Sequence, residues 1–215
     1  MLNFSELLNE TKIITILRGI PSDKLTDVLD ALYAGGIRLA EITYDRTGDV
    51  KNEDTAANIG RAVAHTKGRM LIGAGTVLDR RQVAMTAEAG GSFIISPDTN
   101  PEVIEATKAA GLISLPGAMT VTEVCTALRH GADYVKLFPA NILPPSFVKA
   151  VLAPLRGAKL LAVSGVTTEN IPEYLKAGCV GFGVGTNIAN KALAESGRFD
   201  LIAENAKNFI EACKV

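Results

Sequence analysis

A glycine that ends a predicted helix and is followed at once by a short apolar run recurs along this chain. The pattern reads AGGIRLAEIT from Ala34, AGGSFIISP from Ala89, AAGLISLPG from Ala109, HGADYVKLFP from His130 and AGCVGFGVG from Ala177. Glycine accepts the left-handed conformation in which many helices end, so each glycine indicates where a helix stops and a strand follows. Strand candidates lie at about 13–17, 39–44, 70–76, 93–97, 113–117, 134–138, 160–164 and 181–185.

The stretches between the strand candidates have the apolar spacing of helices. Residues 25–32 and 121–128 place apolar side chains three and four positions apart, which puts them on one helix face. Helix starts are indicated by three capping sequences: Thr120 with Glu123, Asp79 with Gln82, and Asn100 before Pro101. Short apolar strands that alternate with helices are typical of a parallel sheet buried on both faces.

Chain length limits how such a sheet can be arranged. A chain of 215 residues accommodates eight strand–helix units as one domain. The sequence therefore predicts an α/β fold, a single-domain (β/α)8 TIM barrel over residues 1–215 with a short N-terminal helix. An open, doubly wound parallel sheet is the alternative.

Charge and composition exclude several classes of function. The net charge of -1 gives no electrostatic footprint for nucleic acid or an anionic membrane, and no apolar run is long enough to span one. The start of the chain lacks a signal-peptide pattern, and Cys125, Cys179 and Cys213 are widely spaced, which predicts reduced thiols and a cytoplasmic protein. His65 and His130 are the only histidines, so a histidine-rich metal site cannot form.

Charged residues interrupt three of the apolar strand candidates. Arg18, Glu41 and Lys136 stand inside or at the end of such runs, where an unpaired charge is costly to bury. Glu41 and Lys136 each lie five residues after the last glycine of their repeat, as do Ser96 and Gly183. Because alternate strands of a barrel share a layer of inward side chains, Glu41 and Lys136 are expected to point into the same interior.

A structural and a catalytic interpretation of these charges are both open. The structural one is a Glu41–Lys136 salt bridge across the barrel mouth. The catalytic one is favoured by their place at the carboxyl ends of strands, where active sites of such barrels lie. A desolvated lysine beside a cation can attack a ketone as the neutral amine, and the resulting iminium withdraws electrons from the neighbouring carbon. Glu41 could move the accompanying proton, and Arg18 could hold a carboxylate.

Two later segments are candidates for a phosphate site. Val163–Asn170 and Gly181–Asn187 follow the last two strand candidates, the usual place for phosphate in this architecture. The second segment adds the Thr186 hydroxyl to its glycines, although glycine there can also serve only close packing. Thr76 has two interpretations of equal standing: a donor to a substrate carboxylate, or a cap of the helix that begins near Asp79.

Six short motifs, in order along nearly the whole chain, resemble the KDPG/KHG aldolase family. They are EIT at 41–43, GAGTVL at 73–78, ISP at 95–97, LPGAMT at 115–120, KLFPA at 136–140 and SGVTTENI at 164–171. These are 2-keto-3-deoxy-6-phosphogluconate and 4-hydroxy-2-oxoglutarate aldolases. The resemblance implies a class I aldolase on a (β/α)8 barrel, usually a trimer, that needs no metal or other cofactor.

The resemblance also implies roles for single residues. Lys136 would form the Schiff base, and Glu41 would act as the acid and base through a water molecule. The other expected residues form a pyruvate and carboxylate pocket (Arg18, Arg46, Thr76, Pro97, Pro116 and Phe138) and a phosphate site (Ser164, Gly165, Gly185 and Thr186). The chain departs from the family at Asp45, where an arginine is usual, with Arg46 one place later, and at Asp98, where a glycine is usual.

The expected reaction is reversible cleavage of a 2-keto-3-deoxy-6-phospho sugar acid to pyruvate and glyceraldehyde 3-phosphate. A 4-hydroxy-2-oxoglutarate or phosphogalactonate-type aldolase is the alternative within the family. A phosphosugar isomerase or epimerase, or a non-catalytic binder on the same barrel, is the alternative outside it. The expected partners are a small keto acid or sugar phosphate and, by resemblance alone, two further copies of the chain in a homotrimer.

Overall fold

The strands of the computed structural model, which describes residues 2–214, are all parallel and form one sheet. They are β1 (Ile13–Leu17), β2 (Leu39–Thr43), β3 (Leu71–Gly75), β4 (Phe93–Ile95), β5 (Ile113–Leu115), β6 (Gly117–Ala118), β7 (Val135–Leu137), β8 (Leu160–Val163) and β9 (Gly181–Val184). Their order is β5-β4-β3-β2-β1-β9-β8-β7-β6. Both edges of this sheet belong to consecutive segments of chain, β5 and β6, so the sheet closes into a barrel.

A single proline separates the two edge strands. Pro116 has no backbone N–H to add to the ladder, and the fifth predicted strand, 113–117, is therefore split into β5 and β6. The first half pairs with β4 and the second with β7. The nine strands thus correspond to eight strand–helix units, and the predicted (β/α)8 barrel is confirmed.

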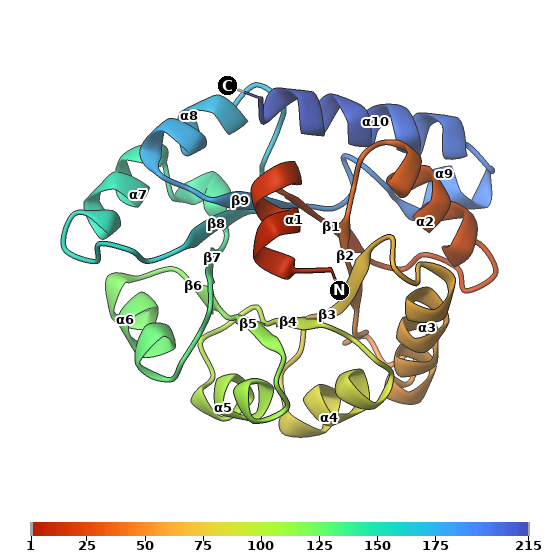
Figure 1. Cartoon of the computed structure of the whole chain (residues 1–215), viewed down its shortest axis with the longest axis horizontal. Coiled ribbons are helices and arrows are strands. Elements are labelled where there is room, and N and C mark those ends of the chain that lie inside the picture. The colour runs from red at the N-terminus through yellow and green to blue at the C-terminus, as the bar shows by residue number, and fades with distance from the viewer. Residues whose placement is uncertain (1, 215) are drawn as a thin grey trace.

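The helices form a ring outside the strands (Figure 1). They are α2 (Leu25–Ala34), α3 (Asn52–His65), α4 (Arg80–Glu88), α5 (Pro101–Ala109), α6 (Val121–Arg129), α7 (Pro145–Leu152), α8 (Ile171–Ala177), α9 (Lys191–Glu195) and α10 (Phe199–Ala212), with a 3₁₀ turn η1 (Ala140–Ile142) before α7. All three predicted caps are present. The side chains of Asp79 and Asn100 accept hydrogen bonds from the backbone N–H groups of Gln82 and Glu102, and Thr120 with Glu123 forms a complete capping box.

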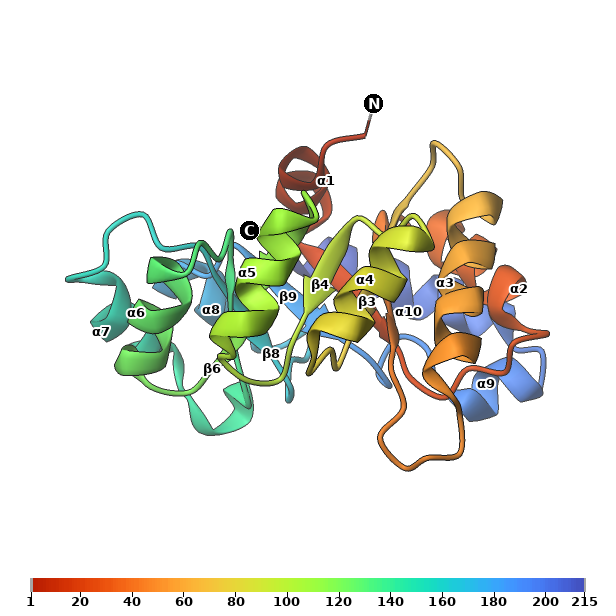
Figure 2. The same ribbon diagram turned by 90° about the horizontal axis from the view of Figure 1, so that it is seen from below.

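The predicted N-terminal helix, α1 (Phe4–Thr11), lies across the middle of the ring and closes one end of the barrel (Figures 1 and 2). Phe4 inserts into the interior, with its ring centroid 5.2 Å from Phe93 and 5.3 Å from Tyr134. Leu8 is also buried against this inner cluster. Because α1 covers the amino ends of the strands, the barrel opens only at their carboxyl ends, where the loop after β2 projects (Figure 2).

Within residues 2–214, no helix is both long enough and apolar enough to cross a bilayer.

Candidate active site

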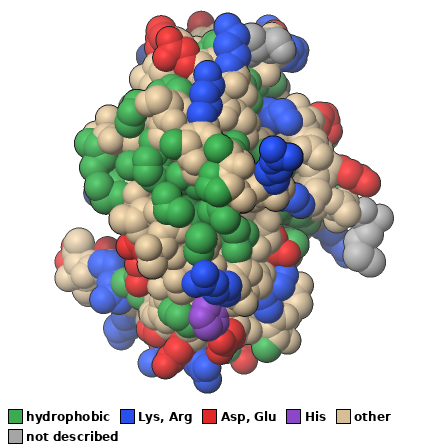
Figure 3. All heavy atoms as spheres, turned by 90° about the vertical axis from the view of Figure 1, so that its left-hand side faces the viewer, with side chains coloured by type: hydrophobic (Ala, Val, Ile, Leu, Met, Phe, Trp, Pro, Cys, Tyr) green, Lys and Arg blue, Asp and Glu red, His purple; other side chains and the backbone are tan. Residues whose placement is uncertain are grey.

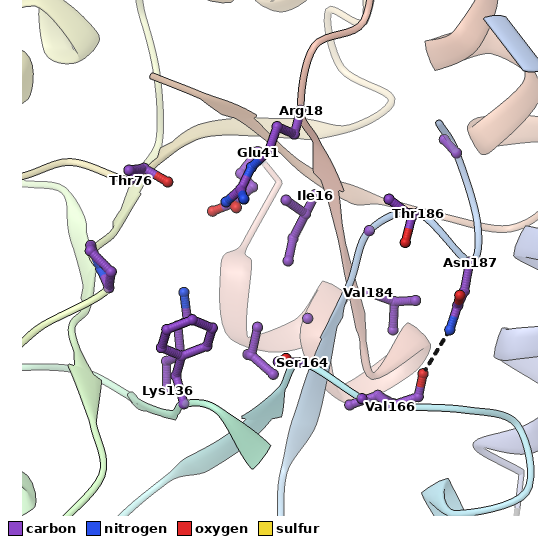
Figure 4. Close-up of a pocket in the computed structure, with 17 residues that line it drawn as sticks. Ile16, Arg18, Glu41, Thr76, Lys136, Ser164, Val166, Val184, Thr186 and Asn187 are labelled. Carbon is purple, nitrogen blue, oxygen red and sulfur yellow. Dashed lines mark hydrogen bonds between the residues drawn. The ribbon is translucent and has the colours of Figure 1, made fainter. Parts of the chain in front are cut away.

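A cavity of about 280 Å³ opens at the carboxyl ends of the strands. The residues around it come from the first to fourth, sixth, seventh and eighth strand–helix units, far apart in sequence (Figure 4). They include Ile16, Arg18, Glu41, Thr76, Pro97, Lys136, Phe138, Ser164, Gly165, Gly183, Gly185, Thr186 and Asn187. Most residues predicted for the site therefore meet in one cavity, at the end of the barrel where enzymes of this architecture carry out chemistry.

Glu41 supplies a carboxyl buried at the bottom of this cavity. Its side chain comes from the middle of β2 and is only 2% exposed, and Oε2 is buried with no hydrogen-bond partner. Burial raises the pKa of Glu41 from 4.5 to about 7, while the nearby charges of Lys136 and Arg18 oppose that increase. A carboxyl with a pKa of about 7 can both release and accept a proton near neutral pH.

Lys136 enters the cavity from the middle of β7. Its side chain is 8% exposed, and burial together with Arg18 lowers its pKa, against the opposing effect of Glu41. The Nζ atom lies 4.4 Å from the ring centroid of Phe138, which lines the same wall. The backbone N–H of Lys136 donates to the carbonyl of Pro116, 2.9 Å away, which holds β7 against the broken strand. A lysine with a lowered pKa has more of the neutral amine that attacks carbonyl carbon.

Glu41 and Lys136 point into the cavity from opposite sides (Figure 4). No ion pair joins the two among the described residues, and the free Oε2 of Glu41 shows that its bonding capacity is unused. The structural interpretation, a salt bridge across the barrel mouth, is therefore not what the structure contains. The space between the two groups is suited to a substrate or a water molecule.

Two residues at the rim adopt a backbone conformation that is unfavourable for residues other than glycine. Thr76 has a φ of 56° and Ser164 a φ of 79°. Such residues are strained by on the order of 1–3 kcal/mol each and concentrate at binding sites. Asp79, not Thr76, caps α4, so the capping interpretation of Thr76 is wrong. Its position beside the cavity is the one that the carboxylate interpretation requires.

The loops after β8 and β9 form the other side of the cavity. Ser164 and Gly165 come from the first loop, and Gly185 and Thr186 from the second. Asn187 connects the two loops, because its Nδ2 donates to the carbonyl of Val166 at 3.2 Å (Figure 4). The predicted phosphate residues therefore lie together, in a small, polar and glycine-containing rim.

Arg46 lies in a different place from the one expected. It lines a larger neighbouring cavity, of about 740 Å³, which shares Arg18 and Thr76 with the first. The cause is Asp45, whose carboxylate accepts hydrogen bonds from the amides of Thr47, Gly48 and Val50 and folds the loop after β2 around itself. The bonds from Val50 and Thr47 lower the pKa of Asp45. The acid at this departure from the family pattern thus organises the loop, and Arg18 is the arginine that reaches the main cavity.

Other predicted positions differ in their relation to the cavity. Pro116 is buried and contacts Lys136 through its backbone carbonyl rather than lining the space, and Ser96 is buried outside it. The apolar residue Ile16 and the amide Asn187 line the cavity but were not predicted as site residues. Asn187 stands in the glycine-containing run that indicated the phosphate site, whereas nothing in the sequence distinguishes Ile16 from a core residue.

Within the described part of the chain, no three His, Cys, Asp or Glu side chains come together as a metal site would require.

Comparison with protein families extends the resemblance seen in the motifs. The model of the KDPG and KHG aldolase family matches residues 4–205. A probable 2-dehydro-3-deoxy-6-phosphogalactonate aldolase of Rhizobium meliloti (strain 1021) is 35% identical over 180 residues, which are 83% of this chain and 82% of the relative. A 2-dehydro-3-deoxy-phosphogluconate aldolase of Pseudomonas aeruginosa is 31% identical over 212 residues, 95% of this chain and 90% of the relative.

Solved structures show the same relationship. A native KDPGal structure superposes with a TM-score of 0.85 at 33% identity and covers 93% of both chains. A KDPG aldolase from Legionella pneumophila, with pyruvate captured as a covalent carbinolamine intermediate, has a TM-score of 0.84 at 24% identity and covers 96% of this chain and 97% of its own. With residues 4–205 of the chain matched by the family model and the barrel reproduced, this chain is an aldolase and belongs to the KDPG and KHG aldolase family.

Proposed function

We propose that this barrel, acting as a single domain, is a class I aldolase that reversibly cleaves a 2-keto-3-deoxy-6-phospho sugar acid to pyruvate and glyceraldehyde 3-phosphate. One observation carries the proposal: a buried lysine of lowered pKa and a buried carboxyl with a pKa of about 7 face each other across one cavity without forming an ion pair. An isomerase or a binding protein would need no such lysine. The captured carbinolamine of the Legionella pneumophila enzyme supports covalent chemistry in the family.

The reaction follows from the two groups. Neutral Lys136 Nζ attacks carbon 2 of the keto acid, and loss of water from the carbinolamine leaves an iminium. Glu41, directly or through water, takes the proton from the carbon-4 hydroxyl while the bond between carbons 3 and 4 breaks. The electron pair of that bond enters the iminium to form an enamine, and the aldehyde leaves. Protonation of the enamine carbon and hydrolysis then release pyruvate and restore Lys136.

The carboxylate of the keto acid is assigned to Arg18 and Thr76. Both line the cavity, and the position four residues after Glu41, usually arginine in the family, is occupied by Asp45, which is engaged in its own loop. The Arg18 guanidinium therefore takes over the anchoring charge, helped by the Thr76 hydroxyl. Pro97 and Phe138 supply apolar walls on the pyruvate side, where exclusion of water favours iminium formation.

The phosphate is assigned to the rim formed by Ser164, Gly165, Gly185 and Thr186. Glycine permits close approach of an anion to backbone amides, and the two hydroxyls add donors. The relatives named above act on 6-phospho-galactonate or phosphogluconate derivatives, substrates that carry this phosphate. A shorter dicarboxylic keto acid would leave the rim unused, so the phosphorylated sugar acid is the better fit.

A panel of keto acids tests this function directly. We expect pyruvate release from 2-keto-3-deoxy-6-phosphogluconate or its galactonate epimer, with much lower kcat/KM for the same acids without phosphate and for 4-hydroxy-2-oxoglutarate. The assay is run in EDTA, because the iminium supplies the electron sink and the proposal needs no metal. Equal kcat/KM with and without phosphate, or loss of turnover in EDTA, would contradict the proposal.

Two variants in the same panel separate the two anion sites. Arg18→Ala should raise KM for every keto acid, because each presents the same carboxylate. Thr186→Ala should raise KM for the phosphorylated acids alone, by about 5- to 10-fold for one lost hydrogen bond of 1 kcal/mol or slightly more. Uniform effects of both variants would mean that the rim after β9 does not hold the phosphate.

The proposal includes assembly into a homotrimer. Apolar side chains gather on the face that carries α6 and α7 (Figure 3). Three of the four large apolar side chains exposed in the described chain lie here. They are Met119 in the loop before α6, Val121 in α6 and Ile142 in η1, at 44%, 44% and 54% exposure. Light scattering should give the mass of three chains. Ile142→Asp should reduce it, whereas Val50→Asp, on the exposed loop after β2, should not; a single-chain mass for the unaltered protein would overturn the assembly.

The cellular compartment is proposed on the same footing. Cys125, Cys179 and Cys213 are all free thiols, as in the reducing cytoplasm, and burial raises the pKa of the Cys179 and Cys213 thiols to about 12. Recovery of the protein in the periplasmic or secreted fraction of its cells would contradict this placement.

A further inference from the structure

Gly75, the last residue of β3, lies directly against the carboxyl of Glu41 although it has no part in the chemistry above. In the parallel pairing of β2 and β3, Glu41 is opposite Gly73, and Gly75 is the next inward position toward the mouth. A Cβ atom at Gly75 would lie closer than 3.0 Å to Cδ, Oε1 and Oε2 of Glu41. The carboxyl therefore occupies the volume that any other residue at position 75 would need for its side chain.

Backbone conformation does not account for a glycine at this position. Gly75 is not among the described residues with positive φ, and it pairs regularly with Thr43, so alanine would fit the backbone. Glycine in a strand interior gives up side-chain packing and usually marks a close approach. For Gly73 the close neighbour is the Phe93 ring and carbonyl, a packing contact of the core. For Gly75 the three nearest atoms all belong to one ionisable carboxyl.

We propose that Gly75 is a positioning residue for the aldol reaction. Its missing side chain leaves a space, the carboxyl seat, in which the Glu41 carboxyl faces Lys136. This inference rests on the acid–base role proposed for Glu41. It gives the second glycine of the GAGT motif a function distinct from that of the neighbouring Thr76, which lines the cavity.

A methyl group at position 75 can displace the carboxyl in two directions. Toward Lys136, the carboxylate gains attraction from the ammonium group; toward the mouth, it regains water. Both changes stabilise the ionised form, so either one lowers the pKa of Glu41 from its value of about 7. The sign of the effect is therefore the same whichever way the side chain moves.

The test is Gly75→Ala. We expect kcat to fall by about 100-fold, the usual effect of misplacing a catalytic group by 1 Å, and the acid limb of kcat/KM to move to lower pH. Borohydride should still trap pyruvate on Lys136, since the lysine keeps its place. An unchanged kcat, or a reduced kcat with the acid limb at its original pH, would overturn the proposal.

A second variant keeps the proposal testable if Gly75→Ala folds poorly. In a Glu41→Ala background the carboxyl is absent, so adding Gly75→Ala should not lower Tm further. If Gly75→Ala lowers Tm by the same amount with and without the Glu41 carboxyl, the carboxyl seat is refuted. Gly60→Ala is the matched glycine control, because its Cβ would meet Ala89 only at 3.8 and 3.9 Å. Ile59→Val, on the buried face of α3, should lower Tm without moving the acid limb.

The same variants distinguish failure of the inference from failure of the proposed function. If Glu41→Gln retains full turnover, the acid–base role is wrong, yet the seat would still be visible as a loss of Tm in Gly75→Ala that vanishes without the carboxyl. If Glu41→Gln is inactive but Gly75→Ala behaves like Gly60→Ala, the role stands and the seat is wrong.

Discussion

Lys136→Ala is expected to abolish pyruvate release, on the order of a 10⁶-fold loss, which is the typical effect of removing a covalent nucleophile. The physical reason is that, among the described residues, Lys136 is the one amine that lines the cavity: Arg18 is the other cation there, and a guanidinium does not attack ketones. Initial rates of pyruvate formation measure the loss, and circular dichroism measures whether the variant keeps its fold.

The nucleophile can be identified independently of the rate. Borohydride reduction in the presence of pyruvate should attach the keto acid to one peptide, the one that contains Lys136. Lys159 is the matched control, because it precedes β8 at the closed end of the barrel and lies over the Tyr134 ring, 5.0 Å from its centroid. Lys159→Ala should therefore keep both turnover and adduct. An adduct on any other lysine, or a Lys136→Ala enzyme that still releases pyruvate, would exclude the Schiff-base mechanism at this residue.

The order of strands and helices could be predicted because its determinants are local. A glycine that ends a helix, a cap that begins one and a short apolar run each act within a few residues, and β1 at Ile13–Leu17 was predicted to the residue. The sequence shows a proline at position 116 but does not show that the strand breaks there. The break follows from closure of the barrel, in which β5 and β6 pair with different neighbours. Glu41 and Lys136 could be predicted to face the same interior because each lies five residues after the last glycine of its repeat, which is also a local feature.

The finer geometry of the site was not predictable in this way, because it depends on the conformation of a loop and on contacts between distant segments. Whether Arg46 reaches the cavity depends on how the loop after β2 folds, and Asp45 determines that through its bonds to three amides. The relation of Gly75 to Glu41 requires the pairing of β2 with β3. The sequence singled out both regions, Asp45 as a departure from the family pattern and Gly75 within a matching motif, but their contacts follow only from the assembled barrel.

Glu41→Gln is expected to slow turnover by roughly two to four powers of ten, the usual contribution of a general acid or base. Glutamine occupies the same seat beside Gly75 but cannot take the proton from the carbon-4 hydroxyl. Steady-state rates at saturating substrate measure the loss, and borohydride trapping should show that Lys136 still forms its adduct with pyruvate. Turnover within about threefold of the unaltered enzyme would remove Glu41 from the mechanism.

The pH dependence of the same variant tests the cause. Cleavage needs the ionised carboxyl, so kcat/KM of the unaltered enzyme should fall as the pH drops through about 7, the pKa to which burial raises Glu41, and not through 4.5. In Glu41→Gln that limb should disappear, leaving only the ionisation of Lys136. An acid limb near 7 that survives the substitution would assign it to another group.

Stability should change with the opposite sign to activity. Because the pKa of Glu41 is higher in the folded protein than in the unfolded chain, protonation favours folding below pH 4.5, and this contribution is lost as the pH rises through about 7. Glu41→Gln escapes the loss, so its Tm relative to the unaltered enzyme should increase between pH 4.5 and 7 and then level off. Thermal melts at a series of pH values provide the measurement. A Tm difference that is constant with pH would mean that burial does not raise the pKa of this carboxyl, and the enzyme would then need another source for its acid and base near neutral pH.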